Sequence, residues 1–160
     1  MHGADWAHEV SFQNKLPRKR RDRRTNRPVG YGAREDLQKQ ARQHSHTGKV
    51  IPELKMVFWE KMLTSRHDND FWNNYLTAAF PHLPAGHATV VHRNELREKF
   101  ESVRDVRNRL GHHESVCDRS RFDLPQIFVN MMTVLSWRDP ALHDWVADFE
   151  TVRSVLARRP

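Results

Sequence analysis

The residues best suited to chemistry lie between positions 106 and 115, where the sequence reads VRNRLGHHES. Arg107 and Asn108 precede a glycine, and His112, His113 and Glu114 follow it. Histidine accepts or releases a proton near neutral pH, and arginine presents a planar fork of donors that matches phosphate oxygens. Cleavage of an RNA phosphodiester without a metal needs a base, an acid and a cation, so these residue types could perform it.

Two other interpretations of this segment stay open. Cationic side chains in a last helical turn stabilise the negative end of the helix dipole by about 0.3–1 kcal/mol, and Gly111 would be an ordinary left-handed cap. A metal held by His112, His113 and Glu114 is disfavoured, because adjacent side chains point apart and no spaced further ligands follow. We therefore predict neither a metal nor a cofactor. In the catalytic interpretation, Gly111 is a hinge that returns His112 toward Arg107.

The elements that would position these residues are helices throughout. Apolar residues at spacings of three and four predict helices over residues 33–43, 51–63, 70–80, 90–110, 124–135 and 140–156. Asp70 is expected to cap one helix, and Asp139 followed by Pro140 to start the last. No alternating pattern or Asn-Gly turn predicts a strand. We expect an all-α fold, a bundle of four or five helices.

Composition points to one helical domain behind a basic segment. The 160 residues are 38% hydrophobic, which suffices for one core. The net charge is +7, and residues 1–49 account for all of it, because they carry 12 Lys/Arg and 5 Asp/Glu. Like-charge repulsion, prolines and glycines predict a disordered leader over residues 1–32, followed by a helical domain over 33–160.

The excess positive charge indicates an anionic partner, nucleic acid before membrane. The basic residues predicted to contact RNA are Arg18, Lys19, Arg20, Arg21, Arg23, Arg24, Arg104 and Arg109. No segment approaches the roughly 20 apolar residues of a membrane-spanning helix, and nothing resembles a signal peptide. With the single cysteine, Cys117, this predicts a cytoplasmic protein.

Other conspicuous residues are expected to be structural. His82, His87 and His92 recur five apart, which is no helical spacing, and are predicted to be solvated or core histidines. Tryptophans on the apolar stripes, Trp145 among them, are predicted to lie in the core.

Four segments resemble one known family. VRDVRNRLGHHES resembles the RNR-small-apolar-HHEP signature of the bacterial abortive-infection (Abi-like) family, within the HEPN superfamily of helical ribonucleases. TGKVIPELKMVFWEKML, FWNNYLTAAFP and VLARRP resemble further segments of that family, so the resemblance spans about residues 33–160. The chain departs from the family pattern in three respects. It has Gly111 in place of alanine and Ser115 in place of proline, and it lacks a recognisable upstream helical segment of the family.

The resemblance implies a metal-independent endoribonuclease that acts as a homodimer, with two copies of the motif facing each other. Arg107, Asn108 and His112 match the superfamily motif, and His113 and Glu114 match the family's extended form. It also implies a toxin-like role in phage defence or a toxin–antitoxin system, with a cognate antitoxin as a further partner. The alternative hypothesis is a non-catalytic helical RNA-binding or antitoxin-type module, which includes a truncated and inactive member of the family.

Overall fold

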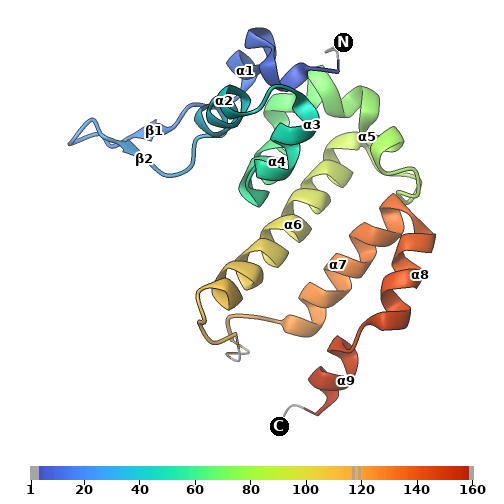
Figure 1. The fold of residues 1–160 in the computed structure, drawn as a ribbon. Helices are drawn as coiled ribbons and strands as arrows, with labels where there is room; N and C mark the ends of the chain where they lie inside the picture. Colours follow the sequence, from blue (N-terminus) through green and yellow to red (C-terminus); the bar gives the residue numbers. More distant parts are fainter. Residues whose placement is uncertain (1–3, 117, 119, 159–160) are drawn as a thin grey trace. The chain divides into compact units, whose positions relative to one another are not determined.

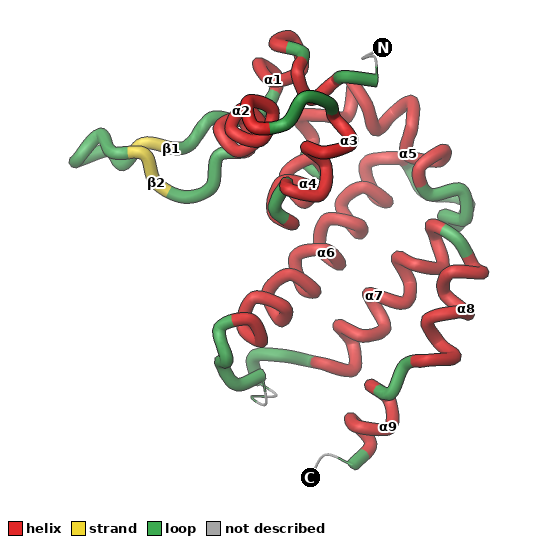
Figure 2. Tube along the Cα trace, viewed as in Figure 1, coloured by secondary structure: helices red, strands yellow, loops and turns green. Residues whose placement is uncertain are grey.

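The computed structural model describes residues 4–116, 118 and 120–158, and the lone cysteine, Cys117, lies outside them. The chain forms two compact units, Met1–Met62 and Leu63–Pro160. We predicted a boundary after residue 32, whereas the boundary between the two units follows Met62. Within the described ranges helices predominate and the only sheet has two strands, which confirms the all-α prediction (Figure 2).

The first unit packs short helices around a small apolar core. It contains 3₁₀ turns at Trp6–His8 and Ile51–Glu53, and helices α1 (Val10–Lys15), α2 (Ala33–Gln43), α3 (Thr47–Val50) and α4 (Met56–Met62). Fully or almost fully buried are Ala7, Leu16, Leu37, Val50 and Phe58. The predicted helix at 33–43 is confirmed as α2.

The expectation of no regular structure before residue 33 is wrong. Residues 6–15 form a 3₁₀ turn and α1, because Ala7 and Leu16 bury their side chains completely or nearly so. A hairpin then follows, in which β1 (Arg20–Arg21) pairs antiparallel with β2 (Pro28–Val29), and it projects from the helices of its unit (Figure 1).

Side-chain hydrogen bonds build this hairpin and tie it to α2. Asp22 Oδ1 accepts from the backbone N–H of Thr25 at 2.7 Å, and Asn26 adopts a left-handed backbone with φ of 53°. The Glu35 carboxylate accepts from the Lys19 N–H at 3.2 Å. Asx-type turns of this kind replace the Asn-Gly signal, which is why the sequence did not predict the strands.

The predicted helix over residues 51–63 is divided, and that prediction is wrong in its first half. Pro52 lies in the 3₁₀ turn Ile51–Glu53, and Leu54 is extended with ψ of 132°. Proline restricts the turn before it, not the residues after it, so the break is not due to Pro52; it falls at Leu54, which leaves the helical conformation and buries its side chain. Of the predicted helix, only the second half forms, as α4.

The second unit is built on the long helix α6. It contains a 3₁₀ turn at Ser65–His67, a π turn at Asp68–Trp72, and helices α5 (Asn73–Ala79), α6 (Thr89–Gly111), α7 (Leu124–Arg138), α8 (Pro140–Phe149) and α9 (Val152–Ala157). Helix α7 packs against α6 and α8 (Figure 1). The predicted helices at 90–110 and 124–135 are confirmed.

Of the two predicted helix starts, Asp70 and Asp139, only Asp139 is confirmed. The Asp139 carboxylate accepts from the Ala141 N–H at 2.9 Å and starts α8 as predicted, and Asp123 caps α7 in the same way. Asp70 is not an N-cap, because helical backbone already begins at Ser65 and Asp70 lies inside the π turn.

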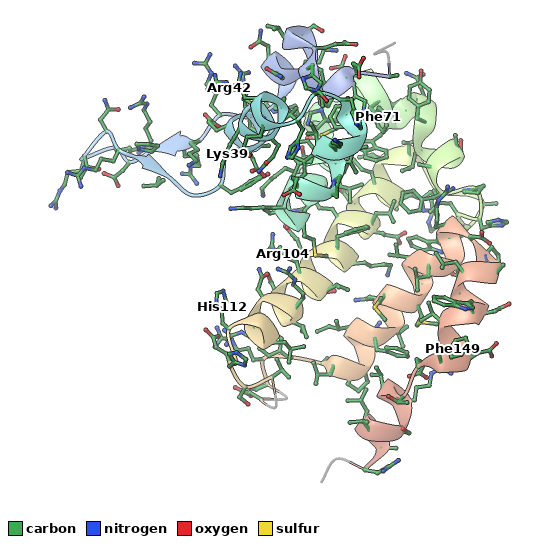
Figure 3. The ribbon with its side chains drawn as sticks, in the orientation of Figure 1. Lys39, Arg42, Phe71, Arg104, His112 and Phe149 are labelled. Carbon is green, nitrogen blue, oxygen red and sulfur yellow. The ribbon has the colours of Figure 1, made fainter. Side chains whose placement is uncertain are left out.

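The last predicted helix, 140–156, is interrupted between α8 and α9, and its core prediction is wrong. Trp145 and Phe149 are 62% and 72% exposed, and Figure 3 shows Phe149 at the end of α8. Helix α8 packs mainly against α7, so its opposite apolar face has no covering layer in the described chain. No described helix combines the length and apolar character needed to cross a bilayer.

Candidate active site at the end of α6

Helix α6 ends in a left-handed cap formed by a histidine rather than a glycine. His113 has φ of 58°, its N–H donates to the Leu110 carbonyl at 3.1 Å, and the Glu114 N–H donates to the Arg109 carbonyl at 2.9 Å. These two bonds define a Schellman motif with His113 at the position that glycine usually occupies. Our expectation that Gly111 is the left-handed residue is wrong, because Gly111 is the last helical residue of α6.

The cap turns the chain back along the last turn of α6 and opens a pocket there. The pocket has a volume of about 430 Å³ and is lined by Asp105, Asn108, Arg109, His112, Glu114, Arg121 and Phe122. Three of these residues, Asp105, Asn108 and Arg109, lie on one face of the last turns of α6, and His112 follows as the C-cap of the helix. Figure 3 shows His112 beyond the final helical turn, with Arg104 further back on the same helix.

Ion pairing and ring contacts hold one wall of the pocket in place. Arg109 Nη1 donates to Glu114 Oε2 at 2.8 Å, and the Arg109 guanidinium lies 5.0 Å from the centre of the Phe122 ring. The guanidinium of Arg121 lies 5.9 Å from the same ring. Phe122 is buried, so it supplies a fixed apolar surface against which both cations are oriented.

A turn that begins at Asp118 carries Arg121 and Phe122, the two pocket residues farthest along the chain from α6. The backbone N–H of Phe122 donates to the Asp118 carbonyl at 2.9 Å, and the Ser120 hydroxyl donates to Asp118 Oδ1 at 2.6 Å. Hydrogen bonds from Ser120 lower the pKa of the Asp118 carboxyl below its ordinary value, so it stays ionised.

The structure brings together most of the predicted catalytic residues. Asn108, His112 and Glu114 line the pocket, and Arg107 is exposed beside it, where its Nη1 donates to Asn108 Oδ1 at 3.2 Å. The side chain of Asn108 thus connects the Arg107 guanidinium to the pocket. His113 is exposed and is not among the residues that line it.

The predicted RNA-contacting residues fall into two groups. Arg104 and Arg109 lie on α6, where Arg104 Nη2 donates to Asp105 Oδ1 at 2.8 Å. The other six are exposed residues in or beside the hairpin of the first unit: Arg18, Lys19, Arg20, Arg21, Arg23 and Arg24. Of the eight predicted RNA-contacting residues, only Arg109 lines the pocket.

Sequence reasoning missed Asp105, Arg121 and Phe122. Asp105 precedes Asn108 by three residues, a spacing that does signal a shared helix face. Arg121 and Phe122 reach the pocket only through the turn that begins at Asp118, and nothing in their local spacing indicates this. His112, His113 and Glu114 do not gather their ligand atoms as a metal would require.

A scan against protein-family models, a search of curated proteins and a search of solved structures each returned no match to this chain. The pocket and its residues therefore carry the functional argument.

Proposed function

We propose that this protein is a metal-independent endoribonuclease whose active site is the pocket at the end of α6. The observation that carries the proposal is the gathering of three groups at this helix end: His112 and Asn108 line one pocket, and the Arg107 guanidinium donates to the Asn108 amide. An imidazole supplies proton transfer and a guanidinium supplies fixed positive charge, which are the two requirements of phosphodiester cleavage.

In the proposed reaction, the ribose 2′-oxygen attacks the phosphorus and the bond to the 5′-oxygen breaks. A base removes the proton of the 2′-hydroxyl, and an acid donates a proton to the departing 5′-oxygen. The products are a 2′,3′-cyclic phosphate and a 5′-hydroxyl, so atoms and charge balance without a cofactor. Arg107 holds the phosphate as its charge redistributes, and Arg109, paired with Glu114, keeps the pocket wall in place.

One chain supplies one histidine to the pocket, whereas the reaction uses both a base and an acid. We propose that the second imidazole comes from a second copy of the chain in a homodimer. The exposed basic residues of the β1–β2 segment support an RNA substrate, because most nucleic-acid affinity comes from phosphate contacts. The cellular role we propose, a cytoplasmic toxin-like nuclease in phage defence or a toxin–antitoxin system, rests on the family resemblance.

The same exposed basic hairpin also favours a second candidate, an RNA-binding or antitoxin-type module without turnover. A cleavage assay separates the two, because only the nuclease produces shortened RNA.

Arg107→Ala is expected to slow RNA cleavage in EDTA by roughly 10²- to 10³-fold, the usual loss when one preorganised charge-stabilising donor is removed. Because Arg107 is exposed, the variant should unfold at the same denaturant concentration as the wild type. The measurement is the single-turnover rate on a labelled RNA, with enzyme in excess.

Arg97→Ala is the matched control, since it removes the same charge from the same helix ten residues earlier, where Arg97 pairs with Glu101 at 3.0 Å. Its cleavage rate should stay within about twofold of wild type, the scale of a surface charge change of a few tenths of a kcal/mol. Equal loss in both variants would indicate a general charge effect, and absence of cleavage by the wild type would contradict the nuclease proposal.

A further inference from the structure

A second group of side chains with chemical potential lies at the other end of α6, where the helix begins. His87, in the preceding loop, and His92 and Glu95, on the first turns of α6, place one ligand atom each within 4.8 Å of one another. The rings of His87 and His92 are 5.3 Å apart. Among the residues that the structure describes, this is the only group of three or more candidate ligands so arranged.

The hydrogen bonds of His92 determine which of its nitrogens faces the group. His92 is 5% exposed, and its Nε2 lies 3.0 Å from the Pro84 carbonyl oxygen. A carbonyl oxygen only accepts, so Nε2 carries the hydrogen and Nδ1 of a neutral ring carries the lone pair. That lone pair faces Glu95 Oε2 at 3.4 Å. Two acceptors at this distance repel unless a proton or a metal cation lies between them, and a metal ion would use both lone pairs at once.

The distance between His92 Nδ1 and Glu95 Oε2 is the distance expected between two ligands of one metal ion. Ligands bound about 2.0–2.1 Å from a tetrahedral zinc ion are about 3.3–3.4 Å apart, which matches the separation of His92 Nδ1 and Glu95 Oε2. All three ligand atoms lie within 4.8 Å of one another, so the exposed loop residue His87 needs to move by at most about 1.4 Å to reach the tetrahedral spacing.

The surroundings of His92 also match those of a metal ligand. A ligating histidine typically donates its other ring N–H to a carbonyl or carboxylate, and the Pro84 carbonyl occupies that position here. The ring of Trp137, on α7, lies 6.3 Å from the His92 ring and restricts its motion. Two imidazoles and one carboxylate are a ligand set typical of zinc with one further open position.

We propose that His87, His92 and Glu95 form a zinc site that fastens the loop before α6 to the start of that helix. The site is separate from the proposed nuclease pocket, because His92 lies nineteen residues before Gly111, the last residue of α6, or about 28 Å along the helix. Zinc bound there would stabilise the fold, because a ligand that binds only the folded chain raises its stability.

The test is zinc binding by the full chain after treatment with EDTA and removal of the chelator. Isothermal titration should give one Zn²⁺ per chain, and zinc should raise the melting temperature, whereas Mg²⁺ should do neither. Co²⁺ in the same site should give the intense visible absorption of a tetrahedral ion.

His87→Asn and Glu95→Gln each remove one ligand. His87 is exposed and Glu95 is half-buried, so neither substitution is expected to unfold the chain. Each should weaken zinc binding by more than about tenfold, the smallest loss expected even for a second-shell partner. His82→Asn is the matched control, an exposed histidine of the same loop outside the group, and should bind zinc as the wild type does.

Three results would overturn the proposal: no zinc bound by the wild type, equal zinc affinity in His87→Asn, Glu95→Gln and wild type, or a weak Co²⁺ spectrum typical of six oxygen ligands. Any of these would leave the contact between His92 and Glu95 as an ordinary side-chain pair. None depends on RNA cleavage, so this test and that of the nuclease fail independently.

Discussion

Replacing His112 by alanine is expected to slow RNA cleavage by about 10²- to 10⁴-fold, which is the usual contribution of one general acid or base. His112 is the pocket's only histidine, and its backbone N–H donates to the Asn108 carbonyl at 3.0 Å, which fixes the start of its side chain. Because the His112 side chain is exposed, its removal should leave the free energy of unfolding within about 0.5 kcal/mol of wild type. The loss is therefore expected in the chemical step.

His143→Ala is the control for this experiment. His143 belongs to the same unit, on α8, where its Nδ1 lies 2.8 Å from Asp144 Oδ1, and it is not among the residues that line the pocket. The variant should cleave RNA at the wild-type rate. If His112→Ala cleaves as fast as His143→Ala, the imidazole at the end of α6 takes no part in the reaction and the site assignment is wrong.

Replacing Arg93 by alanine is expected to lower the free energy of unfolding by about 3–5 kcal/mol, the usual cost of breaking a buried ion pair. Arg93 is 3% exposed, its Nε lies 2.6 Å from Asp68 Oδ1, and its Nη1 donates to the Leu63 carbonyl at 3.2 Å. It thereby ties the start of α6 to the 3₁₀ and π turns before α5. The substitution leaves Asp68 and that carbonyl without their partner.

Urea unfolding followed by circular dichroism measures this loss, with Arg97→Ala as the matched comparison. The Arg97–Glu101 pair is about one third exposed on both sides, so breaking it should cost at most about 0.5 kcal/mol. A loss below about 1 kcal/mol for Arg93→Ala would mean that solvent or another group replaces the Asp68 pair, and that α6 is not anchored there.

Much of the second unit could be predicted because its signals are local. Helices α6 and α7 follow from apolar residues three and four apart, and Asp123 and Asp139 cap the helices that they precede. Asn108 and His112 share the pocket because His112 follows α6 directly, four residues after Asn108, and its N–H still donates to the Asn108 carbonyl. Short-range spacing therefore identified the helices and the part of the site that one helix carries.

What the sequence did not predict depends on contacts between distant residues or on unusual turns. The hairpin rests on Asp22 as a side-chain acceptor in its turn, and Phe122 enters the pocket only after the chain reverses beyond α6. The left-handed conformation falls on His113 rather than Gly111, because the Schellman bonds fix the position of the turn. His87 meets His92 across a loop–helix boundary, where helical spacing has no predictive value.

The most direct test of the central claim is cleavage, in EDTA, of an RNA and of an otherwise identical strand that carries 2′-deoxyribose at the cleaved positions. Circular dichroism should first show that the chain stays folded in EDTA at the assay temperature. We predict that only the ribose strand is cut and that its products end in a 2′,3′-cyclic phosphate and a 5′-hydroxyl. Cleavage of both strands, or products with a 3′-hydroxyl and a 5′-phosphate, would contradict attack by the 2′-hydroxyl and with it the proposed mechanism.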